Sequence, residues 1–142
     1  MLALILFLAA EIAPPPEVTL SPAPPSESRP NKIGEHRTLS AAQLAKGKWS
    51  KKPRVWRLAI KSTGAAAMRI HFREFHAGTG KVWVHNGKER FGPYSGDGLY
   101  GDGDFWSHVI PGDRLIIEYA GESKTIPFAA REVSHLTVNP LE

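Results

Sequence analysis

Apolar and polar residues alternate with a period of two in the middle of the chain. Residues 55–61 and 68–73 each carry large apolar side chains at every second position, with charged or small ones between them. This period is typical of strands that bury one face. A third run, residues 81–85, ends at Asn86-Gly87, a dipeptide typical of tight hairpins. The pattern therefore predicts three strands whose apolar faces are buried together.

Further strands are predicted toward the C-terminus. Residues 105–110 and 114–119 flank the turn sequence 111–113 and predict a second hairpin, and residues 125–136 predict one or two closing strands. About seven short strands indicate an all-β protein with two antiparallel sheets packed as a jelly-roll-like β-sandwich. A small barrel is the alternative.

Two local signals interrupt the strand pattern. Ser40 and Gln43 have the spacing of a capping box, and Gly47 is suited to end the turn, so one short helix is expected there. Residues 92–119 are expected to form a long loop rich in glycine and aspartate that leads into the second hairpin. This stretch holds six of the chain's 13 glycines, so several of its residues should have positive φ.

The N-terminal residues have the composition of a leader. Residues 2–10 form an apolar run whose length suits a signal-peptide core and falls short of the roughly 20 residues that span a bilayer. Because no basic residue precedes this run, residues 1–13 are assigned to a signal peptide or to the remnant of a membrane anchor; a buried first strand is the alternative. The protein is thus expected to be secreted or held in the cell envelope, periplasmic or extracellular, and to meet a membrane only through this leader.

A proline-rich segment follows the leader. Residues 14–30 contain seven of the 12 prolines, which favour extended polyproline II and oppose both helix and sheet. We therefore assign residues 14–37 to a disordered linker and residues 38–142 to the β-sandwich domain.

Charge and composition limit the possible functions. The chain has no cysteine and a formal charge of +4, and six basic residues lie between residues 46 and 57. Such a cluster can bind phosphates or an anionic surface. A solvent-exposed segment that leads into a strand is the simpler interpretation. No nucleic-acid-binding module is recognisable, so no nucleic-acid partner is expected. Nucleophile motifs and phosphate-binding glycine loops are also missing from the sequence, so we expect no catalysis by this chain.

The best candidate for a metal site is a group of three aspartates among the glycines. Asp97, Asp102 and Asp104 can offer oxygen ligands to calcium, which takes roughly 6–8 of them. Their spacing departs from that of an EF-hand loop, so hydrogen bonds to their own turns are the alternative. Histidines at 71, 76 and 85 show no converging zinc pattern and are expected to be solvated or hydrogen-bonded.

Aromatic residues are candidates for a binding surface. Tyr94, Tyr100, Trp83 and Trp106 can stack on a carbohydrate or a peptide, although Trp106 is equally suited to anchor the loop. Trp83 falls on the same predicted strand face as charged residues, so it is expected to be exposed.

Four segments together resemble a known family. They are H-F-R-E-F-H-A-G-T-G-K-V-W-V-H-N-G, G-P-Y-S-G-D-G-L-Y-G-D-G-D-F-W-S, I-P-G-D-R-L-I-I-E-Y and I-P-F-A-A-R-E-V-S-H. Residues 53–136 resemble the non-catalytic N-terminal β-sandwich region that precedes the catalytic domain in secreted bacterial trypsin-like serine proteases of the lysyl-endopeptidase type. The block that begins at Gly92 is the most specific part of the likeness.

The resemblance implies an exported accessory or pro-region domain that assists folding, inhibits the protease or engages its substrate. Its partner would be a trypsin-like catalytic domain, in cis or in trans. The 142 residues contain no segment like that catalytic domain, so no catalytic residue is assigned. The alternative function is an extracellular, calcium-dependent module that binds carbohydrate or peptide, and an exported structural domain without a ligand is a third.

Overall fold

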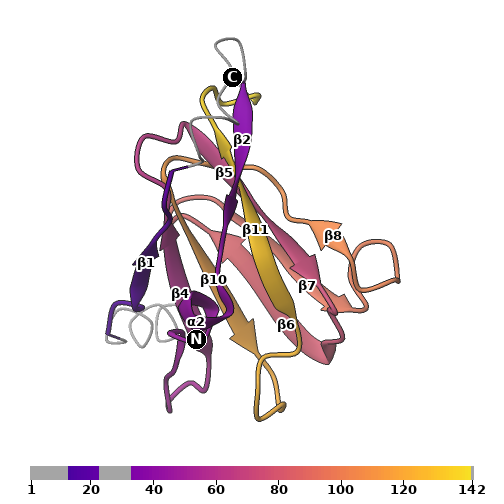
Figure 1. Ribbon diagram of the computed structural model, residues 1–142. Coiled ribbons are helices and arrows are strands. Elements are labelled where there is room, and N and C mark those ends of the chain that lie inside the picture. Colours follow the sequence, from indigo (N-terminus) through magenta and orange to yellow (C-terminus); the bar gives the residue numbers. More distant parts are fainter. Residues whose placement is uncertain (1–12, 23–32, 142) are drawn as a thin grey trace.

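The computed structural model describes residues 13–22 and 33–141, and these residues form a sandwich of two β-sheets (Figure 1). The predicted β-sandwich is therefore confirmed. The larger sheet has the order β1-β4-β10-β6-β7, with β3 paired to β4, and its strands are β1 (Glu17–Thr19), β3 (Lys48–Trp49), β4 (Trp56–Lys61), β6 (Gly78–His85), β7 (Arg90–Gly96) and β10 (Arg114–Ala120). The smaller sheet has the order β2-β11-β5-β8, with β9 paired to β5, and its strands are β2 (Gly34–Thr38), β5 (Ala67–Arg73), β8 (Phe105–Trp106), β9 (Ile110–Pro111) and β11 (Ala129–Leu136).

The core lies between the two sheets and is filled by the alternating apolar residues. Leu58 and Ile60 of β4 and Ile70 and Phe72 of β5 are all fully buried. The period of two seen in the sequence thus identifies correctly which side of each strand faces the core.

One short helix closes one end of the sandwich. Helix α2 (Ala41–Leu44) begins with the predicted capping box: the Gln43 amide donates to Ser40 Oγ at 3.0 Å, and the Ser40 amide donates to Gln43 Oε1 at 2.9 Å. Because Leu44 is buried with the core residues, the helix docks on the sandwich through its last residue.

The segment predicted to be a linker contributes two strands, and this part of the prediction is wrong. The Ala59 amide donates to the Pro16 carbonyl at 2.9 Å and the Leu20 amide to the Lys61 carbonyl at 2.8 Å, so that β1 pairs with β4 in parallel. Val18 and Leu20 are buried in the core. Residues 17–21 lie between two prolines but contain none, and their apolar side chains alternate, which is sufficient for a short strand at the sheet edge. Likewise, β2 pairs with β11.

Residues 1–12 and 23–32 lie outside the described residues. They include nearly all of the predicted leader and the later part of the proline-rich segment. Within residues 13–22 and 33–141, no helix is long and apolar enough to cross a membrane.

The predicted second hairpin is wrong, because its two arms belong to different sheets. Ile110 pairs with Met68 in the smaller sheet, whereas Arg114 pairs with Lys61 in the larger one. The turn between them passes from one sheet to the other and is held by the Gly112 amide, which donates to the Ala66 carbonyl at 2.8 Å. Local turn residues therefore mark the reversal of the chain but not the sheet to which each arm belongs.

The hairpin at Asn86-Gly87 is confirmed, but the strand that follows it was not predicted. Strand β7 pairs with β6 partly through Tyr94 and Gly96, which are expected from the sequence to belong to the long loop. Gly92 and Pro93 interrupt its pattern, and an edge strand tolerates both because one side of its backbone needs no partner.

A buried histidine ties the end of β4 to β11. His135 is 6% exposed, and its Nδ1 lies 2.6 Å from the Ser62 hydroxyl. Burial, aided by the charge of Arg37, lowers the pKa of His135 below its usual 6.5.

We predict that the Leu20→Ala substitution lowers the free energy of unfolding by about 2–5 kcal/mol, since it leaves a cavity in the core. The matched change Thr19→Ala, at the exposed last residue of β1 directly before Leu20, should cost less than about 0.5 kcal/mol. Urea unfolding measures both. Equal effects would mean that β1 does not pack on the sandwich.

We also predict that the protein loses stability as the pH falls from about 6.5 through the lowered pKa of His135. The sign follows because the unfolded chain binds a proton in this window that the folded chain disfavours. His135→Asn, which cannot titrate, should show a shallower loss over the same window. Urea unfolding at several pH values tests this, and parallel pH profiles for the two proteins would contradict it.

Candidate functional site

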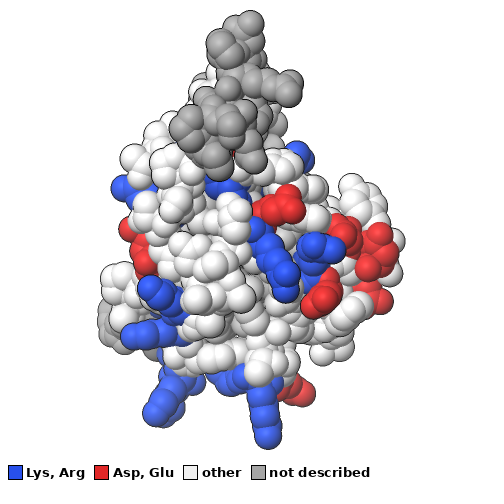
Figure 2. Space-filling model, in the orientation of Figure 1, with Lys and Arg blue, Asp and Glu red and all other residues white. Residues whose placement is uncertain are grey.

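Residues 97–104, here called the acidic loop, connect β7 to β8 and contain three aspartates but no lysine or arginine. Strands β7 and β8 each lie at the edge of their sheet, so the loop crosses from one sheet to the other along one side of the sandwich (Figure 1). Acidic side chains gather on this side of the molecule, at the right of Figure 2.

Backbone hydrogen bonds hold the acidic loop in place. The Gly103 amide donates to the Asp97 carbonyl at 2.8 Å and closes the loop on itself. The Phe75 amide then donates to the Gly103 carbonyl at 3.0 Å, and the Ala77 amide to the Gly96 carbonyl at 2.8 Å. Both ends of the loop are thus fixed to the segment between β5 and β6.

Glycines are required by the backbone of this loop. All six glycines of the stretch 92–119 have positive φ, as predicted. Gly98, at φ 89°, also lies against the Phe105 ring, which a Cβ atom would meet at 2.4 Å. Gly101, at φ 77°, has open space around it. The two positions therefore share one conformational demand but differ in packing.

The three aspartates of the predicted calcium site do not converge. Asp97 Oδ1 lies 3.0 Å from His76 Nδ1, and Asp104 Oδ1 lies 2.5 Å from His71 Nε2. Asp102 Oδ1 accepts from the Asp104 amide at 3.0 Å. In the part of the chain that the structure describes, no group of three or more His, Cys, Asp and Glu side chains is placed to hold a metal ion. Of the three, only Asp102 makes the hydrogen bond to its own turn that is the alternative for this group, whereas Asp97 and Asp104 contact histidines from earlier segments of the chain.

Tyr94 does not belong to an exposed binding surface, and that prediction is wrong. Its side chain is only 3% exposed because it lies on the inner face of β7, the strand that was not recognised in the sequence. The His108 amide donates to the Tyr94 hydroxyl at 3.0 Å, and His108 Nδ1 lies 2.7 Å from the same oxygen. Burial raises the pKa of Tyr94 above 10.0, although the backbone hydrogen bond from His108 opposes the shift.

The two tryptophans assigned to the surface are covered by side chains of their own domain. The Trp106 ring stacks on His71, with centroids 4.7 Å apart, and the Arg69 guanidinium lies 4.5 Å from its centroid. The Arg90 guanidinium lies 4.7 Å from the Trp83 ring centroid. Both tryptophans are half-buried, so neither offers a bare ring face comparable with that of Tyr100.

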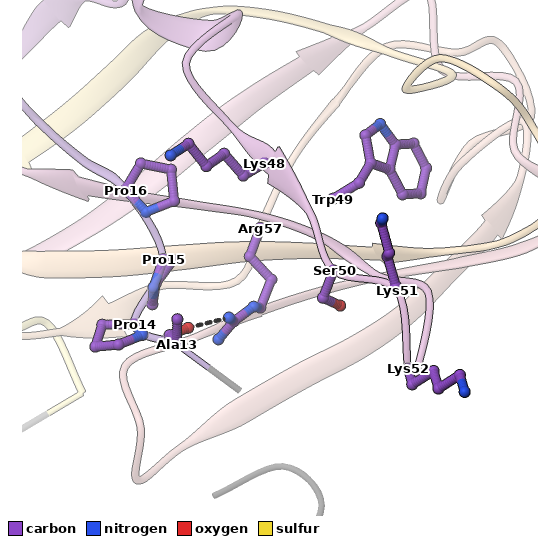
Figure 3. A pocket seen from close by; sticks show the side chains of 10 residues that line it. All are labelled: Ala13, Pro14, Pro15, Pro16, Lys48, Trp49, Ser50, Lys51, Lys52 and Arg57. Atoms are coloured by element: carbon purple, nitrogen blue, oxygen red, sulfur yellow. Dashed lines mark hydrogen bonds between the residues drawn. The ribbon is translucent and has the colours of Figure 1, made fainter. Parts of the chain in front are cut away.

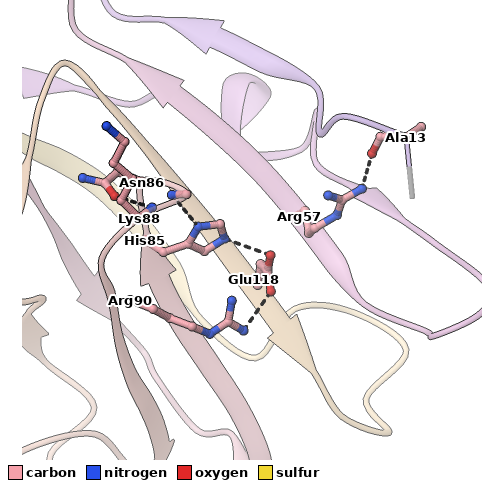
Figure 4. A network of polar contacts seen from close by, with 8 residues as sticks. Ala13, Arg57, His85, Asn86, Lys88, Arg90 and Glu118 are labelled. Atoms are coloured by element: carbon pink, nitrogen blue, oxygen red, sulfur yellow. Dashed lines mark hydrogen bonds and ion pairs between the residues drawn. The ribbon is translucent and has the colours of Figure 1, made fainter. Parts of the chain in front are cut away.

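A polar cluster on the outer face of the larger sheet was missed by sequence reasoning (Figure 4). Glu118 of β10 lies 2.8 Å from His85 Nε2 and accepts from Arg90 at 3.0 Å, so it connects β10 to β6 and β7. Burial raises the pKa of Glu118, but the hydrogen bond from His85 and the charge of Arg90 outweigh it, and the net pKa lies below 4.5. Alternation alone places His85 and Glu118 on outer faces; only the strand order shows that they meet.

The outer part of the acidic loop exposes two large apolar side chains side by side in sequence. Leu99 is 50% exposed and Tyr100 is 76% exposed. Elsewhere in the described residues, the exposed large apolar side chains are Ile33, Val138 and Leu141, which flank the first or last strands of the smaller sheet. A fixed loop that presents an exposed tyrosine next to a leucine is suited to contact another molecule.

The comparisons with known proteins add no assignment. No protein-family model, no curated protein and no solved structure matches the chain. The resemblance to the protease-associated domain thus stays a prediction from the sequence.

We predict that Gly98→Ala destabilises the protein more than Gly101→Ala. Both substitutions force alanine into a left-handed conformation, at about 1–2 kcal/mol each. Only the first also overlaps the Phe105 ring, which adds about 1–3 kcal/mol. Thermal and urea unfolding of the two variants measure the difference, and equal destabilisation would mean that the loop is not packed on Phe105.

Proposed function

We propose that this chain is a non-catalytic accessory domain of an exported trypsin-like serine protease and that it contacts the catalytic domain through the acidic loop. The sequence resemblance supports the class of partner. The exposed Leu99-Tyr100 pair on a loop with a fixed backbone supports the mode of contact. The function of such a contact would be to assist folding of the protease, to block its active site or to engage its substrate.

The observation that carries this proposal is the contrast among the aromatic side chains. Tyr94 is buried, and Trp83 and Trp106 are covered by arginine or histidine, whereas Tyr100 stands 76% exposed. A tyrosine buries a large area on binding and loses little conformational freedom, which is why it is common among residues that dominate binding energy. The fixed backbone lowers the ordering cost further.

The charge of the loop favours a partner with a basic surface. Asp97 and Asp104 remain about half exposed even while they contact histidines, and no lysine or arginine lies in the loop. Carboxylates at the rim of an interface raise the association rate with a basic surface and orient the two partners. They raise the affinity less.

The alternative, a calcium-dependent module for carbohydrate or peptide, has less support. Its three aspartates have separate partners, and of its four aromatic residues only Tyr100 is highly exposed.

Site-specific photocrosslinking tests the proposal. A photoreactive phenylalanine derivative at position 100, in the full chain expressed in its native host, should crosslink to a trypsin-like catalytic domain, on the same polypeptide or on another. The same group at position 88, an exposed residue of the β6–β7 turn, is the matched control and should not. Mass spectrometry of the crosslinked peptides identifies the partner.

With that partner purified, Tyr100→Ala should weaken binding by about 2 kcal/mol or more, roughly 30-fold, and Tyr100→Phe by much less. A crosslink from position 100 to a protein without a catalytic domain, or equal crosslinking from both positions, would contradict the proposal.

A further inference from the structure

A cleft of about 340 Å³ lies between the start of the described chain and the segment around β3 (Figure 3). Residues 13–16 form one wall, and residues 48–52 form the other. Arg57 of β4 points between them and donates to the Ala13 carbonyl. We call this region, lined by three lysines, one arginine and Trp49, the basic cleft.

The positive charge of the basic cleft is not neutralised within the described chain. Lys48, Lys51 and Lys52 are exposed, and none of them, nor Arg57, forms an ion pair with a described carboxylate. Arg54 beside them donates to the carbonyls of Gly121 and Ser123 rather than to an acid. Glu118 of β10 lies opposite Arg57 in the strand register, but its carboxylate contacts His85 and Arg90 instead. Basic side chains accordingly gather at the lower end of the molecule in Figure 2.

A half-buried tryptophan lies in the same cleft. The Arg54 guanidinium lies 3.7 Å from the Trp49 ring centroid, and the ring packs edge-on against Tyr119 at 5.8 Å. Because Arg54 and Tyr119 cover the Trp49 ring, the lysines of the cleft, and not this ring, are the groups available to a ligand.

The position of the cleft along the chain indicates what covers it. Its first wall begins at Ala13, and the apolar run of residues 2–10 lies directly before it in the sequence. Only two residues of the sequence separate this apolar run from the first wall of the basic cleft. A bilayer that holds residues 2–10 therefore brings its headgroups to the cleft.

We propose that the basic cleft binds the phosphate headgroups of an anionic membrane surface, so that the domain contacts the membrane directly and not only through its leader. Lysines 48, 51 and 52 supply exposed ammonium groups for phosphate oxygens, and Arg57 holds the wall formed by residues 13–16 against them. Basic side chains near an anionic bilayer each strengthen binding, and the effect is lost at high salt. This inference does not depend on which protein the acidic loop contacts.

Vesicle binding of the full chain tests the inference. Binding to phosphatidylcholine vesicles measures the contribution of the apolar run, and binding to vesicles that also contain phosphatidylglycerol measures the added contribution of charge. The wild-type chain should prefer the anionic vesicles. The variant Lys48→Gln, Lys51→Gln, Lys52→Gln should bind anionic vesicles about 100-fold more weakly, at about 1 kcal/mol per basic residue, with unchanged binding to neutral vesicles.

A variant with the same net charge is the control. Arg73→Gln, Lys88→Gln, Arg131→Gln removes three exposed basic residues outside the cleft and should retain most of the preference for anionic vesicles. Thermal unfolding confirms that each variant is folded. Equal losses in the two triple variants would show a response to net charge alone and would overturn the proposal. Equal binding of wild type to both vesicle types, with stabilisation by inorganic phosphate instead, would assign the cleft to a free anion and would also overturn it.

Discussion

The packing of aromatic rings around Phe72 is the contact on which the rest of the sandwich depends. Its fully buried ring lies 5.1–5.6 Å, centroid to centroid, from those of Phe75, Phe105 and Phe128, and 6.1 Å from that of Tyr94. These rings come from both sheets and from the loops between them. Edge-on and tilted pairs of this kind add about 0.5–1.5 kcal/mol each beyond the burial of their area. This cluster also fixes the position of the acidic loop. Gly98 packs against the Phe105 ring, and the Gly103 carbonyl accepts a hydrogen bond from the Phe75 amide.

The sequence predicts individual strands better than it predicts their partners. Alternation identifies β4, β5 and β6 because each buries one face, and Asn86-Gly87 fixes the turn of one hairpin. It fails at β7, where Gly92 and Pro93 break the pattern, and at β1, where the prolines on both sides hide a short alternation. The same limit applies to the site. The aspartates were recognised as a group, but His71 and His76, which hold two of them, lie more than 20 positions earlier in the chain.

The acidic loop and the basic cleft lie at opposite edges of the larger sheet. The cleft is formed beside β4 by the residues around β1 and β3, and the loop leaves from β7, which is last in the strand order. Between these edges, the contacts of Glu118 with His85 and Arg90 join the strands across the outer face. A domain that rests on a membrane by its basic edge would thus hold its acidic edge away from the headgroups, where it could meet another protein.

The parallel pairing of β1 with β4 determines how the domain responds to mechanical force. A force applied along the axis of β1 would load its hydrogen bonds to β4 in shear. They must break together, whereas a terminal hairpin arm pulled sideways would unzip one bond at a time. The hydrogen bond from Arg57 to the Ala13 carbonyl adds one more contact just before this strand. The pairing of this short strand would therefore be the first contact to bear a pull on the N-terminal side of the domain.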